Sequence, residues 1–240
     1  MSYMISYHFF ETLPSTQLYA KDHLNEFDLS KIVCIYAKEQ TSGIGTHGRK
    51  WFSPSTQNIY ASFVFSIPMQ LKHFNNLSQI LSLSVSTILK SYKFCPKLRW
   101  PNDIILSEKK VGGVLCDILG DVGILGLGLN VNMNKEDLEL VGQPATSLLV
   151  EGENPPPFEE LLCKIGDQLL VDLERYFQEG FTPFFETYSS LMSYIGAPIH
   201  TTLKGKSIRG LVESVHPDGR LNIKLPDGKT LTISSGSIGC

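Results

Sequence analysis

The residues from Gln40 to Trp51, read as QTSGIGTHGRKW, form the stretch of the sequence best suited to bind a ligand. Three glycines, Gly43, Gly45 and Gly48, let the backbone adopt positive φ angles and approach a ligand closely. Arg49 follows them with a positive charge. This combination is typical of a loop that binds phosphate. An ordinary flexible hairpin loop with solvated charges explains the same residues, because short glycine motifs often occur by chance.

The three glycines also spell G-x-G-x-x-G, the dinucleotide-binding fingerprint, which must open a helix. Here residues 59–66 follow, and their β-branched and aromatic side chains predict a strand. Residues 31–37 predict another strand ahead of the loop. We therefore expect the loop to join strand to strand, as a mobile flap that holds a phosphate through cationic side chains and not through a helix N-terminus.

Further candidate residues lie next to predicted strands. Pro101 fixes a turn that places Asn102 and Asp103 side by side at a strand end. Lys110 stands just ahead of the pair Gly112-Gly113 inside the next strand, where glycines indicate close approach of a ligand or of another backbone. Turns also carry Asn and Asp for local backbone bonding alone, so a structural role explains the Asn-Asp pair equally well.

Near the N-terminus, Ser15 or Thr16 would cap a helix that follows a short strand over residues 4–10, and capping accounts fully for either residue. Together with Gln17 and Gln40, these side chains offer neutral hydrogen-bonding groups. With backbone exposed by glycine, such groups suit a small ligand that has amide or ureido edges.

The cations Lys110 and Arg49 suit an anion, whereas the residues for covalent hydrolysis are missing. The sequence has no Ser-His-Asp order, no reactive thiolate setting and no pair of carboxylates for general acid and base. Activation of a carboxylic acid on ATP needs no protein nucleophile. It needs cations and Mg²⁺ to hold the carboxylate and the α-phosphate together, and a closing flap to exclude water.

The remaining elements provide the frame for these residues. Apolar spacing predicts helices over residues 77–92, 158–178 and 183–195, and it places Leu18, Leu24 and Phe27 on one side of the helix that follows Ser15. Residues 196–240 consist of short alternating segments separated by HPDGR and PDGK turns, which predicts a small all-β module packed on the larger part.

Composition limits the class of protein. The 240 residues contain 42% hydrophobic and 19% charged side chains, as a globular chain does, and the net charge of −3 indicates no general affinity for nucleic acid or anionic membrane. The N-terminus lacks a signal peptide, and no apolar run could cross a bilayer, so we expect a cytoplasmic protein. The five scattered cysteines predict reduced and mostly buried thiols, and neither they nor the six histidines predict a permanent metal site.

Several motifs, in their order, resemble those of the biotin protein ligases. They are PSTQ at 14–17, QTSGIGTHGRKWFSP at 40–54, NIY at 58–60, RWPND at 99–103, KKVGGVL at 109–115 and GLGLNVN at 126–132. Each motif alone is weak, whereas the ordered set is specific and covers essentially the whole chain. The resemblance implies an α+β fold with a mixed-sheet catalytic domain over residues 1–195, flanking helices, and an SH3-like barrel over residues 196–240.

The resemblance also implies a two-step reaction. Biotin and Mg·ATP would give biotinyl-5'-adenylate, and the biotinyl group would then pass to a lysine of the biotin carboxyl carrier protein of acetyl-CoA carboxylase. By position, the biotin site would comprise Ser15, Thr16, Gln17, Gln40, Gly43, Lys110, Gly112 and Gly113. The ATP or adenylate site would comprise Gly45, Gly48, Arg49, Trp51, Asn102 and Asn130. The catalytic residues would be Lys110, Arg49 and Asp103, with Asp103 near the incoming lysine.

Two departures and two alternatives follow from this resemblance. Ile44 and Thr46 stand where many family members have arginines, which predicts a weaker grip on the adenylate. No DNA-binding segment precedes the first motif, so we expect no nucleic-acid partner and either a monomer or a homodimer.

A lipoate or octanoate ligase would share the fold and the chemistry, although GRKW and Gly112-Gly113 argue against it. A non-catalytic binding protein would share the fold alone, although intact Arg49 and Lys110 argue against that.

Overall fold

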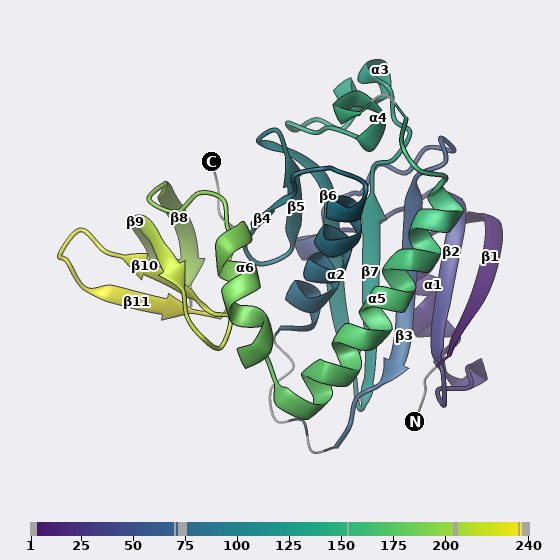
Figure 1. Cartoon of the computed structure of the whole chain (residues 1–240), viewed down its shortest axis with the longest axis horizontal. Helices are drawn as coiled ribbons and strands as arrows, with labels where there is room; N and C mark the ends of the chain where they lie inside the picture. The colour runs from purple at the N-terminus through teal and green to yellow at the C-terminus, as the bar shows by residue number, and fades with distance from the viewer. Residues whose placement is uncertain are drawn as a thin grey trace.

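The computed structural model describes residues 4–236 except 70, 72–75, 153, 204–205 and 235, and it contains two β-sheets with helices (Figure 1). The larger sheet has seven strands in the order β1-β2-β3-β7-β6-β5-β4. Its strands are β1 (Ile5–Leu13), β2 (Ile32–Gln40), β3 (Ile59–Ser66), β4 (Lys97–Arg99), β5 (Asp103–Leu106), β6 (Lys109–Leu119) and β7 (Val122–Leu129). Strands β1 and β2 are parallel, and every other neighbouring pair is antiparallel. The sheet is therefore mixed, as the sequence predicts.

Helices cover both faces of this sheet (Figure 1). The long helices α2 (Leu77–Ser91) and α5 (Phe158–Glu179) pack on each other and on one face, because their apolar residues recur at helical spacing. The short helix α1 (Thr16–Asp22) contacts β3 and β7 on the opposite face. Side chains alternate between the two faces along each strand, so Ile32 and Cys34 join the core below α2 and α5, whereas Val33 and Ile35 join the core near α1.

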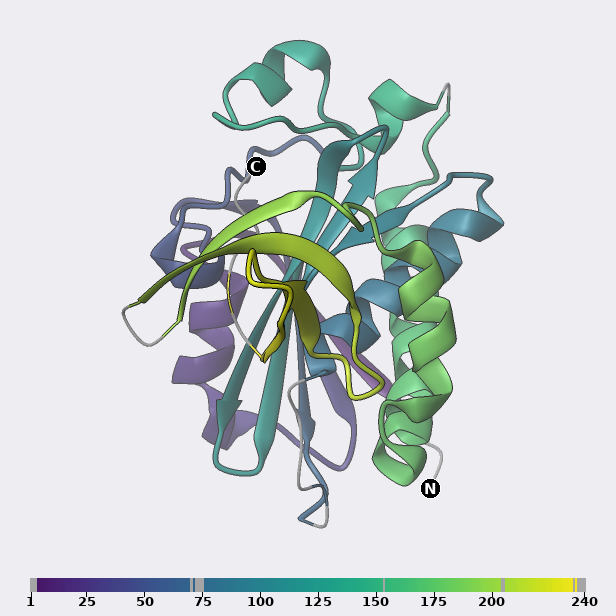
Figure 2. The same ribbon diagram turned by 90° about the vertical axis from the view of Figure 1, so that its left-hand side faces the viewer.

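The second sheet belongs to the C-terminal part of the chain; it lies beside the first in Figure 1 and in front of it in Figure 2. It contains β8 (Pro198–Leu203), β9 (Lys206–Val215), β10 (Leu221–Lys224) and β11 (Thr230–Ile233), all antiparallel, in the order β11-β10-β9-β8. The HPDGR and PDGK turns join β9 to β10 and β10 to β11, as predicted. Buried residues of this sheet, such as Val212 and Ile223, belong to the same apolar cluster as α2 and α5.

The remaining helical segments are short. They are α3 (Lys135–Glu139), α4 (Leu148–Glu151) and α6 (Phe185–Leu191), with 3-10 turns η1 (Leu24–Glu26), η2 (Thr46–Gly48) and η3 (Thr182–Phe184). The predicted helix over 183–195 begins correctly, with η3 leading into α6, but its C-terminal end is wrong. After Leu191 the chain leaves the helix because Met192 forms a bridge with Leu98, and Ser193 N donates to the Leu98 carbonyl at 2.8 Å.

Two further expectations are corrected. Leu18 is 38% exposed, and Leu24 lies beyond the end of α1, because the inward face of that helix carries Thr16, Gln17 and Ala20. The thiols are free but not mostly buried. Cys34 is buried and Cys116 partly so, whereas Cys95 in the turn before β4 and Cys163 on α5 are exposed; Cys240 lies outside the described residues.

Candidate active site

Two adjoining cavities lie on the α1 face of the seven-stranded sheet. The inner cavity is a narrow slot of about 50 Å³, and its floor is formed by Ser62 of β3, Gly113 and Leu115 of β6, and Gly126 and Gly128 of β7. The outer cavity, of about 790 Å³, lies between the flap and the segment that contains Leu140 and Ala145. Gln40, Ile44, Trp51 and Lys110 line both cavities and so mark the border between them, and Lys110 is the charged residue among these four.

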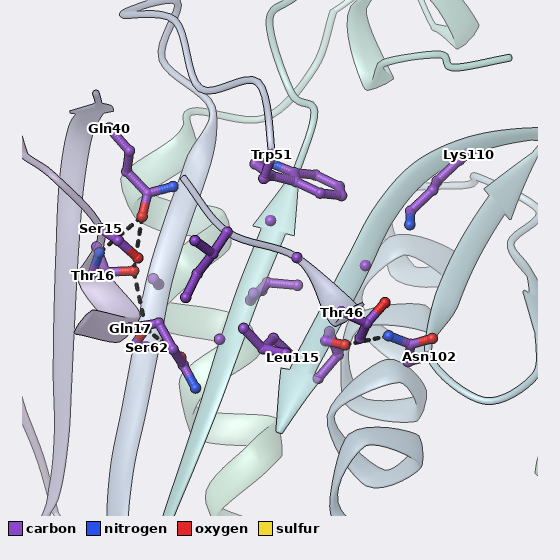
Figure 3. Close-up of a pocket in the computed structure, with 18 residues that line it drawn as sticks. Ser15, Thr16, Gln17, Gln40, Thr46, Trp51, Ser62, Asn102, Lys110 and Leu115 are labelled. Atoms are coloured by element: carbon purple, nitrogen blue, oxygen red, sulfur yellow. Dashed lines mark hydrogen bonds between the residues drawn. The ribbon is translucent and has the colours of Figure 1, made fainter. Parts of the chain in front are cut away.

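One end of the inner cavity is a cluster of neutral polar side chains, seen on the left of Figure 3. Ser15 caps α1 by accepting from Leu18 N, which leaves its hydroxyl proton free to donate. Thr16, Gln17 and Ser62 are all at least 95% buried, and Ser62 is hydrogen-bonded to both of the others. Buried polar groups are costly unless paired, so their concentration here indicates a built recognition surface.

The junction of the cavities holds an ion pair. Lys110 Nζ lies 2.6 Å from Asp103 Oδ1, and both side chains are only about one-fifth exposed, at 18% and 20%. The same ammonium lies 5.2 Å from the centre of the Trp51 ring. Asn102 beside them donates from Nδ2 to the Val114 carbonyl at 2.5 Å, which anchors the Pro101 turn on β6. The turn thus brings Asn102 and Asp103 to the strand end, as predicted.

The flap joins β2 to β3, which are antiparallel, with only the 3-10 turn η2 between them. The prediction of a strand-to-strand loop is therefore confirmed, and the dinucleotide fingerprint is excluded. Ile44 pairs with Lys50, and Trp51 N donates to the Gly43 carbonyl at 2.9 Å, so the flap folds back on itself. Ile44, Gly45 and Thr46 line the inner cavity. Arg49 is exposed and lines the outer one.

The glycines serve different purposes. At Gly43 a Cβ atom would lie 2.5 Å from the Trp51 carbonyl oxygen, so the folded flap itself requires glycine there. Gly43 and Gly48 border the outer cavity, whereas Gly45 borders the inner one. Of the neighbouring pair in β6, Gly113 lines the inner cavity and Gly112 faces the opposite core, where a Cβ would meet Ile104 and Leu129. Adjacent strand residues point to opposite faces, which explains the difference.

Asn130 follows β7 and lines the outer cavity. It is 96% buried, and its Nδ2 donates to the Thr146 carbonyl at 3.0 Å. The predicted biotin and nucleotide residues therefore line two adjoining cavities, with Gly112 turned away. Gly43, expected at biotin, borders the outer cavity, whereas Gly45 and Asn102, expected at the nucleotide, border the inner one. Ser62 and Leu115, as well as Leu140 on the far wall, also line the cavities and are not among the residues predicted from the sequence. Ser62 could have been found, because it is a polar residue inside the apolar run IYASFVFS.

The part of the chain that bears this site resembles a known protein family. The model of the biotin/lipoate A/B protein ligase family matches residues 9–134, more than half of the chain. The chain belongs to this family. A solved family member, a biotin protein ligase from Aquifex aeolicus in complex with biotin and ATP, is 29% identical, with a TM-score of 0.84 and 97% of each chain covered. The mixed-sheet fold expected from the motifs is thereby confirmed.

Curated members of the family are also similar to this chain in sequence. The bifunctional ligase/repressor BirA of Escherichia coli is 28% identical over 215 residues, which cover 87% of this chain and 66% of the relative. The chain thus spans slightly less than two thirds of that relative. A biotin--[acetyl-CoA-carboxylase] ligase of Mycobacterium tuberculosis is 28% identical over 220 residues, with 88% of this chain and 79% of the relative covered.

No helix in the described part of the chain is long and apolar enough to cross a membrane. The described residues also contain no group of three or more His, Cys, Asp or Glu side chains placed to hold a metal ion.

Proposed function

We propose that this protein is an ATP-dependent biotin protein ligase, which activates biotin as biotinyl-5'-adenylate and transfers the biotinyl group to a lysine. The observation that carries the proposal is the position of Lys110. It lines both cavities at their junction, where a carboxylate from one cavity and an α-phosphate from the other would meet. A cation fixed at that point, paired with Asp103, stabilises the negative charge that develops between the two substrates.

The inner cavity suits biotin. One end offers hydroxyl and amide groups for a ureido ring, and the middle is apolar, with the side chains of Ile44, Trp51 and Leu115 along the slot. Lys110 and Asn102 lie at the other end, opposite the polar cluster (Figure 3). A ligand with a polar ring, an apolar chain and a terminal carboxylate matches this sequence of surfaces.

The outer cavity suits the nucleotide. Arg49 supplies a positive charge for phosphate, together with Mg²⁺ carried by the ATP. Asn130 uses its Nδ2 on Thr146, so its amide oxygen is the group offered to the amino edge of adenine. The indole N–H of Trp51 is buried without a partner among the described residues, and a ligand acceptor at the junction would satisfy it.

The first step joins the two substrates. A carboxylate oxygen of biotin attacks the α-phosphorus of ATP, the new P–O bond forms, and pyrophosphate leaves. Lys110 holds the carboxylate and then the phosphate oxygens. The flap residues Ile44, Gly45 and Thr46 cover the slot and exclude water, which protects the mixed anhydride from hydrolysis.

In the second step the amine of the acceptor lysine attacks the acyl carbon, and AMP leaves. The amine must lose a proton to be nucleophilic. Asp103, which lies 2.6 Å from Lys110 at the same junction, is the carboxylate placed to favour that loss. The acceptor is a biotin carboxyl carrier domain. It is recognised by local contacts at this site and not by overall electrostatic attraction, because the net charge of the enzyme is only −3.

The division of the chain follows from the two sheets. We assign residues 1–195 to a catalytic domain and residues 196–240 to an SH3-like barrel, on the support of four short antiparallel strands. A cytoplasmic protein that acts without nucleic acid, as a monomer or a homodimer, accords with this organisation.

Pyrophosphate exchange with separate acids tests the proposal. We expect exchange with Mg·ATP and biotin, little with lipoate or octanoate, and transfer of labelled biotin when a carrier domain is added. Exchange with lipoate and none with biotin would identify a lipoate ligase instead. Tight binding of biotin without any exchange would identify a non-catalytic binding protein.

A further inference from the structure

The Gln17 amide nitrogen is hydrogen-bonded to groups that lie outside the inner cavity. Its Nε2 donates to Asp117 Oδ2 at 2.8 Å and to the Ile124 carbonyl at 3.2 Å. A carboxylate and a carbonyl can only accept, so both amide protons are used there. Lys21 Nζ lies 2.7 Å from the same oxygen of Asp117. The orientation of the Gln17 amide is therefore fixed, with Oε1 on the opposite side.

That oxygen faces the cavity side of the cluster. Gln17 Oε1 lies 2.9 Å from Ser62 Oγ. A Cβ atom on Gly126 would lie 2.6 Å from Oε1, so the absence of a side chain at Gly126 makes room for the amide. Gln17, Ser62 and Gly126 all line the inner cavity, whereas Asp117 does not.

The other end of the cluster is fixed by the backbone. Thr16 N donates to Gln40 Oε1 at 2.9 Å, and Gln40 Nε2 donates to Ser53 Oγ at 2.9 Å. Ser53 in turn donates to the carbonyl of Trp51 at 2.9 Å. Because a backbone N–H only donates and a carbonyl only accepts, the Gln40 amide has a single satisfied orientation, with its oxygen towards Thr16.

Between these two fixed amides, oxygens outnumber protons. Three oxygen–oxygen contacts run from Gln17 to Ser62 (2.9 Å), Ser62 to Thr16 (3.0 Å) and Thr16 to Gln40 (3.2 Å). Only two hydroxyl protons, those of Ser62 and Thr16, are present to serve them. One contact therefore lacks a proton, and this row of four oxygens is rich in acceptors, while Ser15 beside it keeps one hydroxyl proton to donate. A ligand that presents N–H donors fits such a surface.

We propose that Asp117 is a positioning residue that sets the polarity of this cluster by fixing the Gln17 amide, and so selects for a ligand head with N–H donors. If the amide turned over, Nε2 would bring two protons to Ser62 and the surface would become rich in donors. Asp117 acts through Gln17 and touches no substrate. The inference rests on the proposed function, since it takes the ureido ring of biotin as that ligand head.

The test compares wild type with Asp117→Asn in biotin-dependent pyrophosphate exchange. The substituted amide has the same shape as the carboxylate but can donate to Gln17 Oε1, so a turned-over Gln17 amide is then opposed by the Ile124 carbonyl alone. We expect the KM for biotin to rise about tenfold while kcat changes less than about twofold. The second substrate is a biotin analogue whose ureido group is replaced by a cyclic carbamate, which lacks one N–H. Wild type should prefer biotin strongly, and Asp117→Asn should lose most of that preference.

Two further variants complete the experiment. Asp117→Glu keeps an acceptor beside Gln17 and should retain the preference for biotin. Glu11→Gln makes the same chemical change as Asp117→Asn at another lysine-paired carboxylate, 3.2 Å from Lys38 on the exposed side of β1, and should behave as wild type.

Three outcomes would count against the inference. An unchanged preference in Asp117→Asn, with the KM values of both acids unaltered, would overturn it. An equal rise in both KM values would show a merely structural role for Asp117 and would also overturn it. If the wild-type enzyme shows no biotin-dependent exchange, the proposed function itself fails, and this result is distinguishable because it does not depend on any variant.

Discussion

At the scale of single residues, the contact between Trp51 and Gly128 determines how the two cavities meet. A Cβ atom on Gly128 would overlap the indole ring, so the ring rests directly on the backbone of β7. Lys110 lies above the same ring. The indole position therefore depends on the absence of a side chain at residue 128.

Replacing Gly128 by Ala should push the indole out of the junction and lower kcat/KM for biotin-dependent exchange by about 10- to 100-fold, because small displacements of positioning groups are costly. Gly123→Ala is the matched control on the same strand. Its Cβ would lie 2.7 Å from the Phe65 ring in the core, so it should lower the thermal midpoint and leave the KM values unchanged. Equal kinetic effects of the two substitutions would contradict this account.

Some of these residues could be predicted from the sequence and others could not. Lys110 and Gly113 were found because a charge and an interior glycine are unusual in a strand. Asp117 gave a similar signal within the apolar run VLCDIL, but its partner Gln17 is 100 residues away, so only the paired strands bring them together. The separation of Gly112 from Gly113 follows from strand alternation and could have been foreseen.

At the scale of elements, the flap is the part that distinguishes this chain. Ile44 and Thr46 line the inner cavity, and no positive charge lies between them. Arg49 belongs to the outer cavity, where it is exposed. In the proposed reaction the flap would therefore shield the adenylate with apolar and neutral groups.

Ile44→Arg should strengthen the hold on the adenylate, because a charge-assisted hydrogen bond to phosphate adds to the contacts already present. We expect dissociation of biotinyl-5'-adenylate to slow about tenfold. His47→Arg adds a cation to the exposed outer side of the same flap and should change the rate little. The measurement is the release of labelled adenylate from preformed complex. A wild-type rate in Ile44→Arg would refute the weaker grip.

The contact between α2 and α5 gives a prediction about pH. Burial raises the pKa of Asp172, although hydrogen bonds from Ser84 and Gln168 oppose the change. A raised pKa in the folded state means that the folded protein binds this proton more tightly than the unfolded chain does. The contribution of Asp172 to stability is therefore fully present below the unfolded pKa and is lost as pH rises through the folded pKa.

Asp172→Asn keeps the shape and cannot ionise; its oxygen can accept from Gln168, and its Nδ2 can donate to Ser84 Oγ while Ser84 donates to the Ile80 carbonyl. It should raise the thermal midpoint at pH 7 by roughly 2–4 °C, which corresponds to about 1 kcal/mol in a protein of this size. The difference from wild type should shrink as the pH is lowered towards about 4, near the ordinary pKa of an aspartate. A variant less stable than wild type at pH 7 would show that the carboxylate is favourable here.

The presence of a helix can be predicted from the sequence more easily than the residues at which it begins and ends. The stripes over 77–92 and 158–178 match α2 and α5 within a residue, because long amphipathic helices carry a repeated signal. The helix predicted over 183–195 ends early, at Leu191, because pairing of Met192 with Leu98 overrides helical preference. Such pairing depends on a residue far away in sequence, which no local pattern reveals.

At the scale of the whole molecule, the β9–β10 turn docks the C-terminal sheet onto the catalytic part. The Gly219 carbonyl accepts from Gln79 Nε2 at 2.8 Å and from Trp100 Nε1 at 3.0 Å. Asn76 Nδ2 donates to the Asp218 carbonyl at 3.0 Å. Trp100 precedes the turn that carries Asn102 and Asp103, so this docking helps to fix the position of that turn at the candidate active site.

Gly219→Ala should break this docking. Gly219 has φ +83°, and its Cβ would overlap Asn76 Nδ2, so we expect a loss of roughly 2–5 kcal/mol in the free energy of unfolding and reduced exchange activity. Gly228 also has φ +83° in the β10–β11 turn but nothing within 4 Å. Gly228→Ala should therefore lose only about 1–2 kcal/mol and retain activity. Urea unfolding and exchange rates of both variants decide the matter, and equal losses would contradict the docking role.

The sequence predicted a small β module and its two turns but not where it docks. The Asp-Gly turns are nearly identical in sequence, and only packing distinguishes them, since one is buried against α2 and the other is in open space. Contacts between parts that are more than 100 residues apart set this arrangement.

In the proposed reaction, Lys110 joins the acid and the nucleotide at the border of the two cavities. The most direct measurement is the formation of biotinyl-5'-adenylate in a single turnover with Mg·ATP, by wild type and by Lys110→Ala. The account predicts rapid formation by wild type and none detectable by Lys110→Ala, with both proteins folded by circular dichroism. Adenylate formed by the variant at the wild-type rate would contradict it.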